Sequence, residues 1–142
     1  MHVNETSHPT LVLGFADYRE PARRLAAAAG MGYAEGEGHR FPDGERRGPL
    51  PPGLGGRGIL CPSLDRPNDK LVGLALTASA ARELGVRHLT LVAPYLCYMR
   101  QDKAFNPGEA ISQPIIGGLL AQWVDALVTV DPHLHRVATL AE

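Results

Sequence analysis

Arg100, Gln101, Asp102 and Lys103 follow one another and have the side-chain types expected of a phosphate site. An arginine guanidinium can contact phosphate in a bidentate manner, and a lysine ammonium acts on phosphate as a point charge. Gln101 could read the edge of a base or a ribose. The alternative is a solvated loop held by an internal pair between arginine and aspartate.

Asp131, His133 and His135 form a second polar cluster near the end of the chain. In an extended segment, residues i and i+2 point to one face, so the two histidines would lie together. Imidazole and carboxylate groups can bind a divalent metal, and Mg²⁺ would favour the carboxylate oxygen. The alternative is a histidine that is hydrogen-bonded at the end of a strand.

The residues from Ser63 to Lys70 form a third polar segment, which precedes a predicted helix. The amino-terminal amides of that helix could bind an anion. Asp65 and Asp69 would oppose an anion there, which favours helix capping and a subunit contact. Asn68 is the expected N-cap residue.

Phe41, Asp43 and Glu45 belong to a Phe-Pro-Asp-Gly-Glu segment, whose composition predicts a turn. The two carboxylates could accept hydrogen bonds from an adenine amino group or from ribose hydroxyls, with the phenylalanine ring stacked on the base. The alternative is a plain solvated turn.

Strands and helices alternate along the chain and must position these clusters. Apolar runs predict strands at 10–15, 33–34, 58–61, 88–93 and 126–130, and helical patterns occupy 17–29, 68–84 and the stretch from Pro114 to Trp123. This order predicts βαβ units and a parallel sheet. Right-handed crossovers bring the carboxyl ends of such strands to one edge, where ligands bind in open α/β sheets. We therefore expect the clusters at 62–70, 100–103 and 131–136 to converge.

The whole chain fits one domain over residues 1–142, with residues 1–9 expected to be disordered and residues 46–57 expected to be an irregular loop. The net charge of −1 gives no support to nucleic-acid binding. No apolar run approaches the ~20 residues that a membrane span needs, and we find no signal peptide. Two scattered cysteines suit a reducing compartment, so we expect a cytoplasmic protein.

Taken together, these motifs resemble the N-terminal half of the ribose-phosphate pyrophosphokinase (phosphoribosyl-diphosphate synthetase) family, in a divergent branch. The matching segments are Arg40–Glu45, Ser63–Lys70, Pro94–Asp102, Pro114 with its helix, and Val128–His133. The resemblance extends from about residue 10 to residue 136. It implies an α/β three-layer sandwich with a mostly parallel sheet of about five strands, which is a phosphoribosyltransferase-like (Rossmann-like) fold.

The resemblance also implies a reaction, namely Mg²⁺-dependent transfer of the β,γ-diphosphoryl group of ATP to ribose 5-phosphate, for nucleotide biosynthesis. It implies that Phe41, Asp43 and Glu45 contact the adenine across a subunit interface. The ATP-binding residues implied in the same way are Arg100, Gln101 and Asp102, with Lys103 beside them. His133 matches the Mg²⁺–ATP histidine, and His135 and Asp131 rank behind it as metal contacts.

The chain also departs from the family pattern. The family enzyme has two similar domains, and the second-domain loop that binds ribose 5-phosphate is absent here. We therefore expect an enzyme fragment that does not turn over alone and that meets ribose 5-phosphate only if a second domain is supplied. The alternative is a non-catalytic module for regulation or oligomerisation that associates with full-length synthetase, since the family forms homo-oligomers through this domain. A phosphoribosyltransferase ranks lower, because its phosphoribosyl loop is missing.

Overall fold

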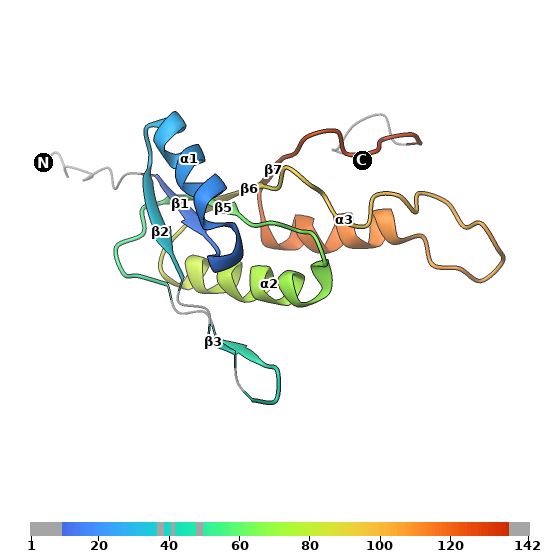
Figure 1. Cartoon of the computed structure of the whole chain (residues 1–142), viewed down its shortest axis with the longest axis horizontal. Helices are drawn as coiled ribbons and strands as arrows, with labels where there is room; N and C mark the ends of the chain where they lie inside the picture. Colours follow the sequence, from blue (N-terminus) through green and yellow to red (C-terminus); the bar gives the residue numbers. More distant parts are fainter. Residues whose placement is uncertain (1–9, 37–38, 41, 48–49, 137–142) are drawn as a thin grey trace, which may run out of the picture.

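A five-stranded parallel sheet forms the centre of the molecule (Figure 1). The computed structural model describes residues 10–36, 39–40, 42–47 and 50–136. The strands, in the spatial order β2-β1-β5-β6-β7, are Gly32–Glu35, Leu11–Gly14, Arg57–Cys61, His88–Val92 and Ala126–Val128. A separate two-stranded antiparallel sheet pairs β3 (His39–Arg40) with β4 (Arg46–Arg47). The expected α/β class with a mostly parallel sheet of five strands is confirmed.

Three α-helices connect the strands, as βαβ units require: α1 (Arg19–Ala29), α2 (Pro67–Glu83) and α3 (Ser112–Trp123). A 3₁₀ turn at 16–18 precedes α1, so this helix begins two residues later than expected. Gly30 ends it with φ 65°, a left-handed conformation that glycine adopts without steric cost.

The start of α2 differs from the expectation. Arg66 occupies the N-cap position and Pro67 the first turn, where a missing N–H costs nothing. Asn68 therefore lies inside the helix, and the prediction that it caps the helix was wrong. Its side chain instead accepts a hydrogen bond from the Tyr98 hydroxyl.

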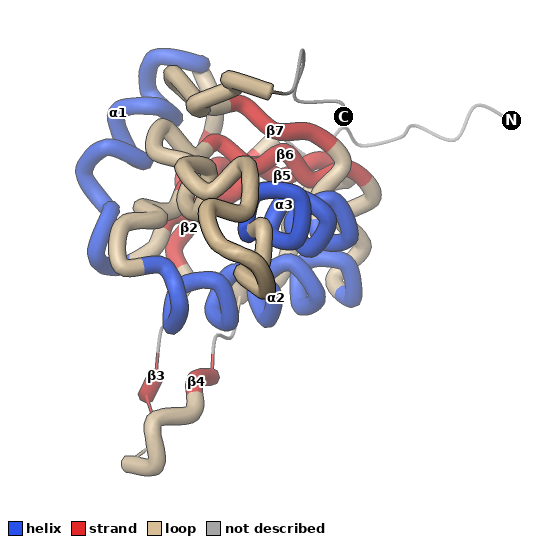
Figure 2. Tube along the Cα trace, turned by 90° about the vertical axis from the view of Figure 1, so that its right-hand side faces the viewer, coloured by secondary structure: helices blue, strands red, loops and turns tan. Residues whose placement is uncertain are grey.

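Helices cover both faces of the sheet, which gives the three layers (Figures 1 and 2). On one face, Ala22 and Ala26 of α1 pack against Val12 and Cys61. On the other face, α2 and α3 enclose a larger core. Its fully buried side chains include Leu13, Leu60, Leu64, Leu74, Leu89 and Leu91. Burying each such leucine contributes about 2 kcal/mol, so this core holds the loops at the sheet edge on a rigid base.

The chain leaves β7 at Val128, two residues before the expected end of the strand. Thr129 Oγ1 and the Val130 N–H both donate to the carbonyl oxygen of Pro94, at 3.5 and 3.2 Å. These bonds bend the segment after β7 over the start of the loop that follows β6. The two loops are thus linked where they leave the sheet.

The segment 46–57, expected to be irregular, has regular structure at both ends. Arg46 and Arg47 form β4, and Arg57 opens β5. Between them, Leu54 is buried in the core, and the carbonyl of Gly56 accepts the N–H groups at the start of β6. The prolines exclude a regular strand, but the loop still packs as part of the domain. Residues 1–9 and Phe41 lie outside the described residues.

Among the helices that the structure describes, none has both the length and the apolar character needed to cross a lipid bilayer.

Candidate functional site

The polar loops after β5, β6 and β7 lie at one edge of the sheet, because these strands run parallel. Figure 1 shows the segments after β6 and β7 leaving the sheet on the same side. The convergence that the sequence predicted for residues 62–70, 100–103 and 131–136 therefore follows from the topology. In open α/β sheets this edge is where ligands bind.

Left-handed backbone conformations gather at the same edge. The described non-glycine residues with positive φ are Arg66 (47°), Tyr98 (61°), Asp131 (47°) and His133 (53°). Each costs on the order of 1 kcal/mol or more, and such strain is concentrated at ligand sites in known proteins. Sequence reasoning could not find these positions, since glycine and asparagine are the usual signals of positive φ.

The first turn of α3 joins the two loops. Ser112 Oγ donates to the carbonyl of Tyr98 at 3.2 Å, and the Gln113 N–H donates to the carbonyl of Gln101 at 3.1 Å. The buried Gln113 side chain reaches the carbonyls of Met99 and His133. Sequence analysis missed this residue, although a polar side chain in the first turn of an apolar helix was an available signal.

The four predicted ATP-binding residues from Arg100 to Lys103 have different surroundings. The Arg100 side chain is exposed, and the Lys103 ammonium lies 5.2 Å from the centre of the Phe105 ring. The Asp102 side chain is only 8% exposed and pairs with Arg136 Nε at 3.4 Å. Asp102 thus pairs with an arginine of the other cluster and not with Arg100 of its own loop, which was the pair considered from the sequence. Arg100 and Lys103 are left as the cations that face solvent within this segment.

Glu109 organises the loop that follows Lys103. Its carboxylate accepts the backbone N–H groups of Phe105 and Asn106 at 3.0 and 3.2 Å, and the Asn106 side-chain amide at 2.6 Å. The Gln101 side chain also donates to it, at 3.5 Å. The hydrogen bond from the Asn106 side chain is the main cause that lowers the pKa of Glu109 below its usual value. A charged Glu109 therefore shapes the loop and orients Gln101.

His133 has a positive φ, so the two histidines do not lie in an extended segment, and the condition under which both would point to one face is not met. The His135 N–H donates to the carbonyl of His133 at 3.1 Å, which forms a γ-turn centred on Leu134. The two rings still lie near each other, with centroids 5.7 Å apart. Within the described residues, no group of three His, Cys, Asp or Glu side chains could hold a metal ion.

Asp43 and Glu45 lie in the turn between β3 and β4. The Glu45 N–H donates to Asp43 Oδ1 at 3.0 Å, which stabilises the turn, and both residues are exposed. The hairpin extends away from the sheet and from the Arg100–Lys103 segment (Figures 1 and 2). Within one chain, the structure does not bring these acids to the other predicted contacts.

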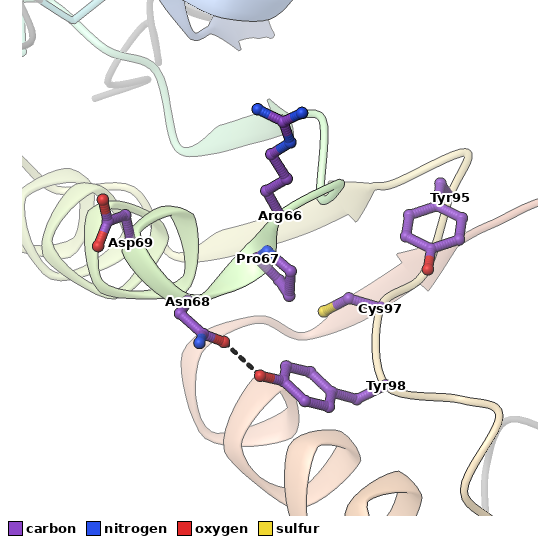
Figure 3. Close-up of a pocket in the computed structure, with 7 residues that line it drawn as sticks. All are labelled: Arg66, Pro67, Asn68, Asp69, Tyr95, Cys97 and Tyr98. Atoms are coloured by element: carbon purple, nitrogen blue, oxygen red, sulfur yellow. Dashed lines mark hydrogen bonds between the residues drawn. The ribbon is translucent and has the colours of Figure 1, made fainter.

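A cavity of about 440 Å³ lies beside the candidate site, between the start of α2 and the loop after β6 (Figure 3). Its lining residues are Arg66, Pro67, Asn68, Asp69, Tyr95, Cys97 and Tyr98. Burial raises the pKa of the Cys97 thiol, which keeps this cysteine neutral. The two tyrosines belong to the segment between β6 and Arg100, so the cavity adjoins the predicted phosphate contacts.

The carboxyl ends of β1 and β2 carry further ion pairs that sequence analysis did not identify. Lys70 Nζ lies 2.9 Å from Asp17 Oδ2 and 2.5 Å from Asp65 Oδ1, and so links the loops after β1 and β5. The Arg19 guanidinium forms two hydrogen bonds to Glu35, at 2.6 and 2.7 Å. At the carboxyl ends of β1 and β2, these charged side chains are therefore paired with one another.

A family model described as the N-terminal domain of ribose phosphate pyrophosphokinase matches residues 10–123. The chain belongs to the ribose-phosphate pyrophosphokinase family. This match confirms the resemblance drawn from the sequence motifs. It includes the Arg100–Lys103 segment and α3, and it ends before Asp131 and His133.

Named relatives extend the comparison. The chain is 38% identical over 131 residues to a ribose-phosphate pyrophosphokinase from Methanopyrus kandleri, covering 92% of this chain and 44% of the relative. It is 43% identical over 96 residues to one from Saccharolobus solfataricus, covering 66% of this chain and 33% of the relative. The chain thus spans less than half the length of these relatives.

A solved structure supports the same fold. The phosphoribosylpyrophosphate synthetase from Mycobacterium smegmatis superposes with a TM-score of 0.78 at 23% sequence identity. The match covers 89% of this chain and 44% of that chain. The α/β sandwich expected from the resemblance is therefore shown by the structural comparison as well.

Proposed function

We propose that this chain is the ATP-binding half of a ribose-phosphate diphosphokinase. In the complete enzyme, diphosphate would pass from ATP to the anomeric hydroxyl of ribose 5-phosphate, giving phosphoribosyl diphosphate for nucleotide biosynthesis. The observation that carries the proposal is the link between the loops after β6 and β7. Contacts from Gln113 and the Asp102–Arg136 pair hold the Arg100–Lys103 segment beside the loop that contains His133.

Arg100 and Lys103 would bind the phosphate chain of ATP. Both side chains are exposed at the sheet edge, and a guanidinium with an ammonium group supplies the charge that a triphosphate needs. Phosphoryl transfer depends mainly on positioning and charge neutralisation, so no protein nucleophile is required. Gln101, held by Glu109, would contact the nucleotide, and Asp102 would act through Arg136.

Magnesium would reach the site with the nucleotide. Mg²⁺ usually keeps several waters and binds through one or two protein groups together with substrate phosphates. The described residues fit this mode, because they offer no three-ligand cage, while His133 is exposed at the edge with Asp131 and His135 nearby. The ion would neutralise charge on the phosphates, and His133 would be its protein-side contact.

Adenine contacts from Phe41, Asp43 and Glu45 would come from a second copy of the chain. The hairpin that carries the two acids extends away from its own Arg100–Lys103 segment (Figure 1). A homo-oligomer would therefore complete the nucleotide site. The described cysteines are buried free thiols, which supports a reducing compartment such as the cytoplasm.

Titration of the chain with Mg²⁺ and a non-hydrolysable ATP analogue tests the proposal. Arg100→Ala is expected to weaken binding about tenfold or more, since a hydrogen bond to a charged group contributes about 1.5–3 kcal/mol. Arg57→Ala is the matched control and should bind like wild type. Arg57 lies at the amino end of β5, whereas the site lies beyond the carboxyl ends of the strands. Equal affinity for Arg100→Ala and wild type would remove Arg100 from the site.

We also propose that the 142-residue chain alone does not turn over. It spans 44% of the Methanopyrus kandleri relative, and the resemblance assigns ribose 5-phosphate binding to a second domain. A coupled assay for phosphoribosyl diphosphate from ATP and ribose 5-phosphate is expected to give no signal. Clear turnover by this chain would disprove the proposal.

A second candidate function is association with another synthetase chain as a non-catalytic module. Val128 and Val130, at and just after the edge strand β7, are 54% and 69% exposed, and Ile115 of α3 is 54% exposed. Sedimentation velocity of this chain mixed with a full-length synthetase, over a range of concentrations, tests this role. Val130→Ser should weaken association, whereas Val72→Ser on α2, with a similarly exposed side chain, should not. The absence of a complex with the full-length synthetase at every concentration would exclude it.

A further inference from the structure

Gln113 is the side chain that contacts both loops of the candidate site. It lies in the first turn of α3 and is only 7% exposed. Its Nε2 atom lies 3.2 Å from the carbonyl oxygen of Met99 and 3.5 Å from that of His133. Its own N–H donates to the carbonyl of Gln101 at 3.1 Å. One residue therefore holds the backbone on both sides of the site.

The chemistry of the amide group suits this position. A glutamine side-chain amide has two N–H donors, and here they face carbonyls from different loops. Removing the donors would take a partner from the Met99 carbonyl in a buried place, and would take one of two donors from the His133 carbonyl, which also accepts the His135 N–H. Losing such a buried hydrogen bond costs more than losing an exposed one. The side chain thus favours one spacing between the loops.

The backbone conformation of His133 gives a second reason for the hydrogen bond from Gln113 to its carbonyl. His133 has φ 53°, which is unfavourable for a non-glycine residue by roughly 1–2 kcal/mol. The hydrogen bond from Gln113 to the His133 carbonyl offsets part of this cost. It therefore stabilises the backbone conformation that directs the His133 side chain.

We propose that Gln113 is a positioning residue, which sets the spacing between the phosphate-binding segment Arg100–Lys103 and the metal contact His133. This inference rests on the proposed nucleotide-binding function. A triphosphate without metal would contact only the loop that carries Arg100 and Lys103. A magnesium–triphosphate complex needs both loops at once, and so depends on the spacing that Gln113 fixes.

Gln113→Met and Gln113→Glu separate this role from packing. Methionine has similar length and no donor, while glutamate keeps the shape and replaces the donors with acceptors. Ser112→Ala is the matched control, because Ser112 lies in the same turn and its side chain donates a hydrogen bond to the Tyr98 carbonyl, which belongs to one of the two loops. The variants are compared by thermal unfolding, so that only folded proteins enter the binding series.

The decisive measurement is the gain in affinity for a non-hydrolysable ATP analogue when Mg²⁺ is added. Wild type and Ser112→Ala should show the same gain. In Gln113→Met the gain should fall about tenfold, the order expected for one lost hydrogen bond to a partly buried acceptor. The gain should then match that of His133→Ala, and combining the two substitutions should cause no further loss. A full magnesium gain in Gln113→Met would overturn the proposal.

Backbone amide chemical shifts give a readout that needs no nucleotide. Gln113→Met should shift amides in both 99–103 and 131–136, whereas Ser112→Ala should affect the first loop alone. Shifts confined to one loop would overturn the positioning role. If wild type binds no triphosphate, the proposed function fails, and the amide shifts still decide whether Gln113 joins the loops. If Gln113→Met does not fold, Gln113→Glu takes its place in both measurements.

Discussion

The carboxylate of Asp102 lies 3.4 Å from Nε of Arg136, and this pair links the segment after β6 to the loop after β7. The Asp102 side chain is 8% exposed, whereas that of Arg136 is 52% exposed. The aspartate is therefore held inside the edge and the arginine covers it from the solvent side. An interaction of this kind depends on both loops keeping their places.

Arg136→Ala is expected to destabilise the protein by about 1 kcal/mol, because it leaves a nearly buried carboxylate without its cation. Asp102→Asn should cost less, since the amide is neutral. In the double variant the two losses should not add, which gives a coupling free energy of roughly 0.5–1 kcal/mol. Urea unfolding measures the loss of unfolding free energy in the two single variants and in the double variant. Arg24→Ala, at an exposed position of α1, is the control, and strictly additive losses would contradict the pairing.

Glu109→Gln is expected to loosen the loop from Lys103 to Ala110. The charged carboxylate accepts two backbone N–H groups, and charge-assisted bonds are roughly twice as strong as neutral ones. Hydrogen exchange at the Phe105 and Asn106 amides should therefore become faster in the variant. The overall unfolding free energy should change little, because the loop lies outside the core.

The matched control for that loop is Glu83→Gln, at the exposed end of α2. It should leave exchange at Phe105 and Asn106 unchanged. The pKa of Glu109 is lowered, so the stabilisation of the loop is present above the ordinary value near 4.5. It is lost as the pH falls below that value. Exchange that is equally slow in Glu109→Gln and wild type would exclude the carboxylate as the loop's organiser.

The sheet and its functional edge could be predicted from the sequence because they depend on local patterns. Apolar runs such as 88–93 are long enough to mark a buried strand, and polar residues follow them directly. Parallel pairing then fixes where those residues meet. The position of Arg100–Lys103 beside the loop of His133 needed no knowledge of side-chain contacts.

The contacts that hold the edge together could not be predicted in this way. Gln113 and Arg136 act across long sequence separations, and no local pattern specifies their partners. The N-cap was assigned to Asn68 from its side-chain type, whereas the structure places Arg66 there with φ 47°. The tendency of asparagine to cap helices is overridden here by a tertiary contact, because the Asn68 side chain accepts a hydrogen bond from the Tyr98 hydroxyl.

The Arg19–Glu35 pair connects the start of α1 to the end of β2 and should make stability depend on pH. Hydrogen bonds from the Arg19 guanidinium are the main cause that lowers the pKa of Glu35 from 4.5 to about 2. A carboxylate with a lowered folded-state pKa stabilises the protein above its unfolded value, and the stabilisation is lost as the pH falls through the folded value. The relevant window therefore runs from about 4.5 down to about 2.

Arg19→Ala is expected to lower the melting temperature at pH 7 and to have little effect near pH 2, where most of the stabilisation from the charged Glu35 is already lost in wild type. The Tyr33 hydroxyl, 2.8 Å from Glu35 Oε2, remains as a partner, so the variant should retain part of the pH dependence. Thermal unfolding between pH 2 and pH 8 measures the difference. Arg24→Ala, which removes an exposed charge from the same helix, should follow wild type throughout. A difference between Arg19→Ala and wild type that stays constant across this range would show that the arginine acts by packing and not through the charge of Glu35.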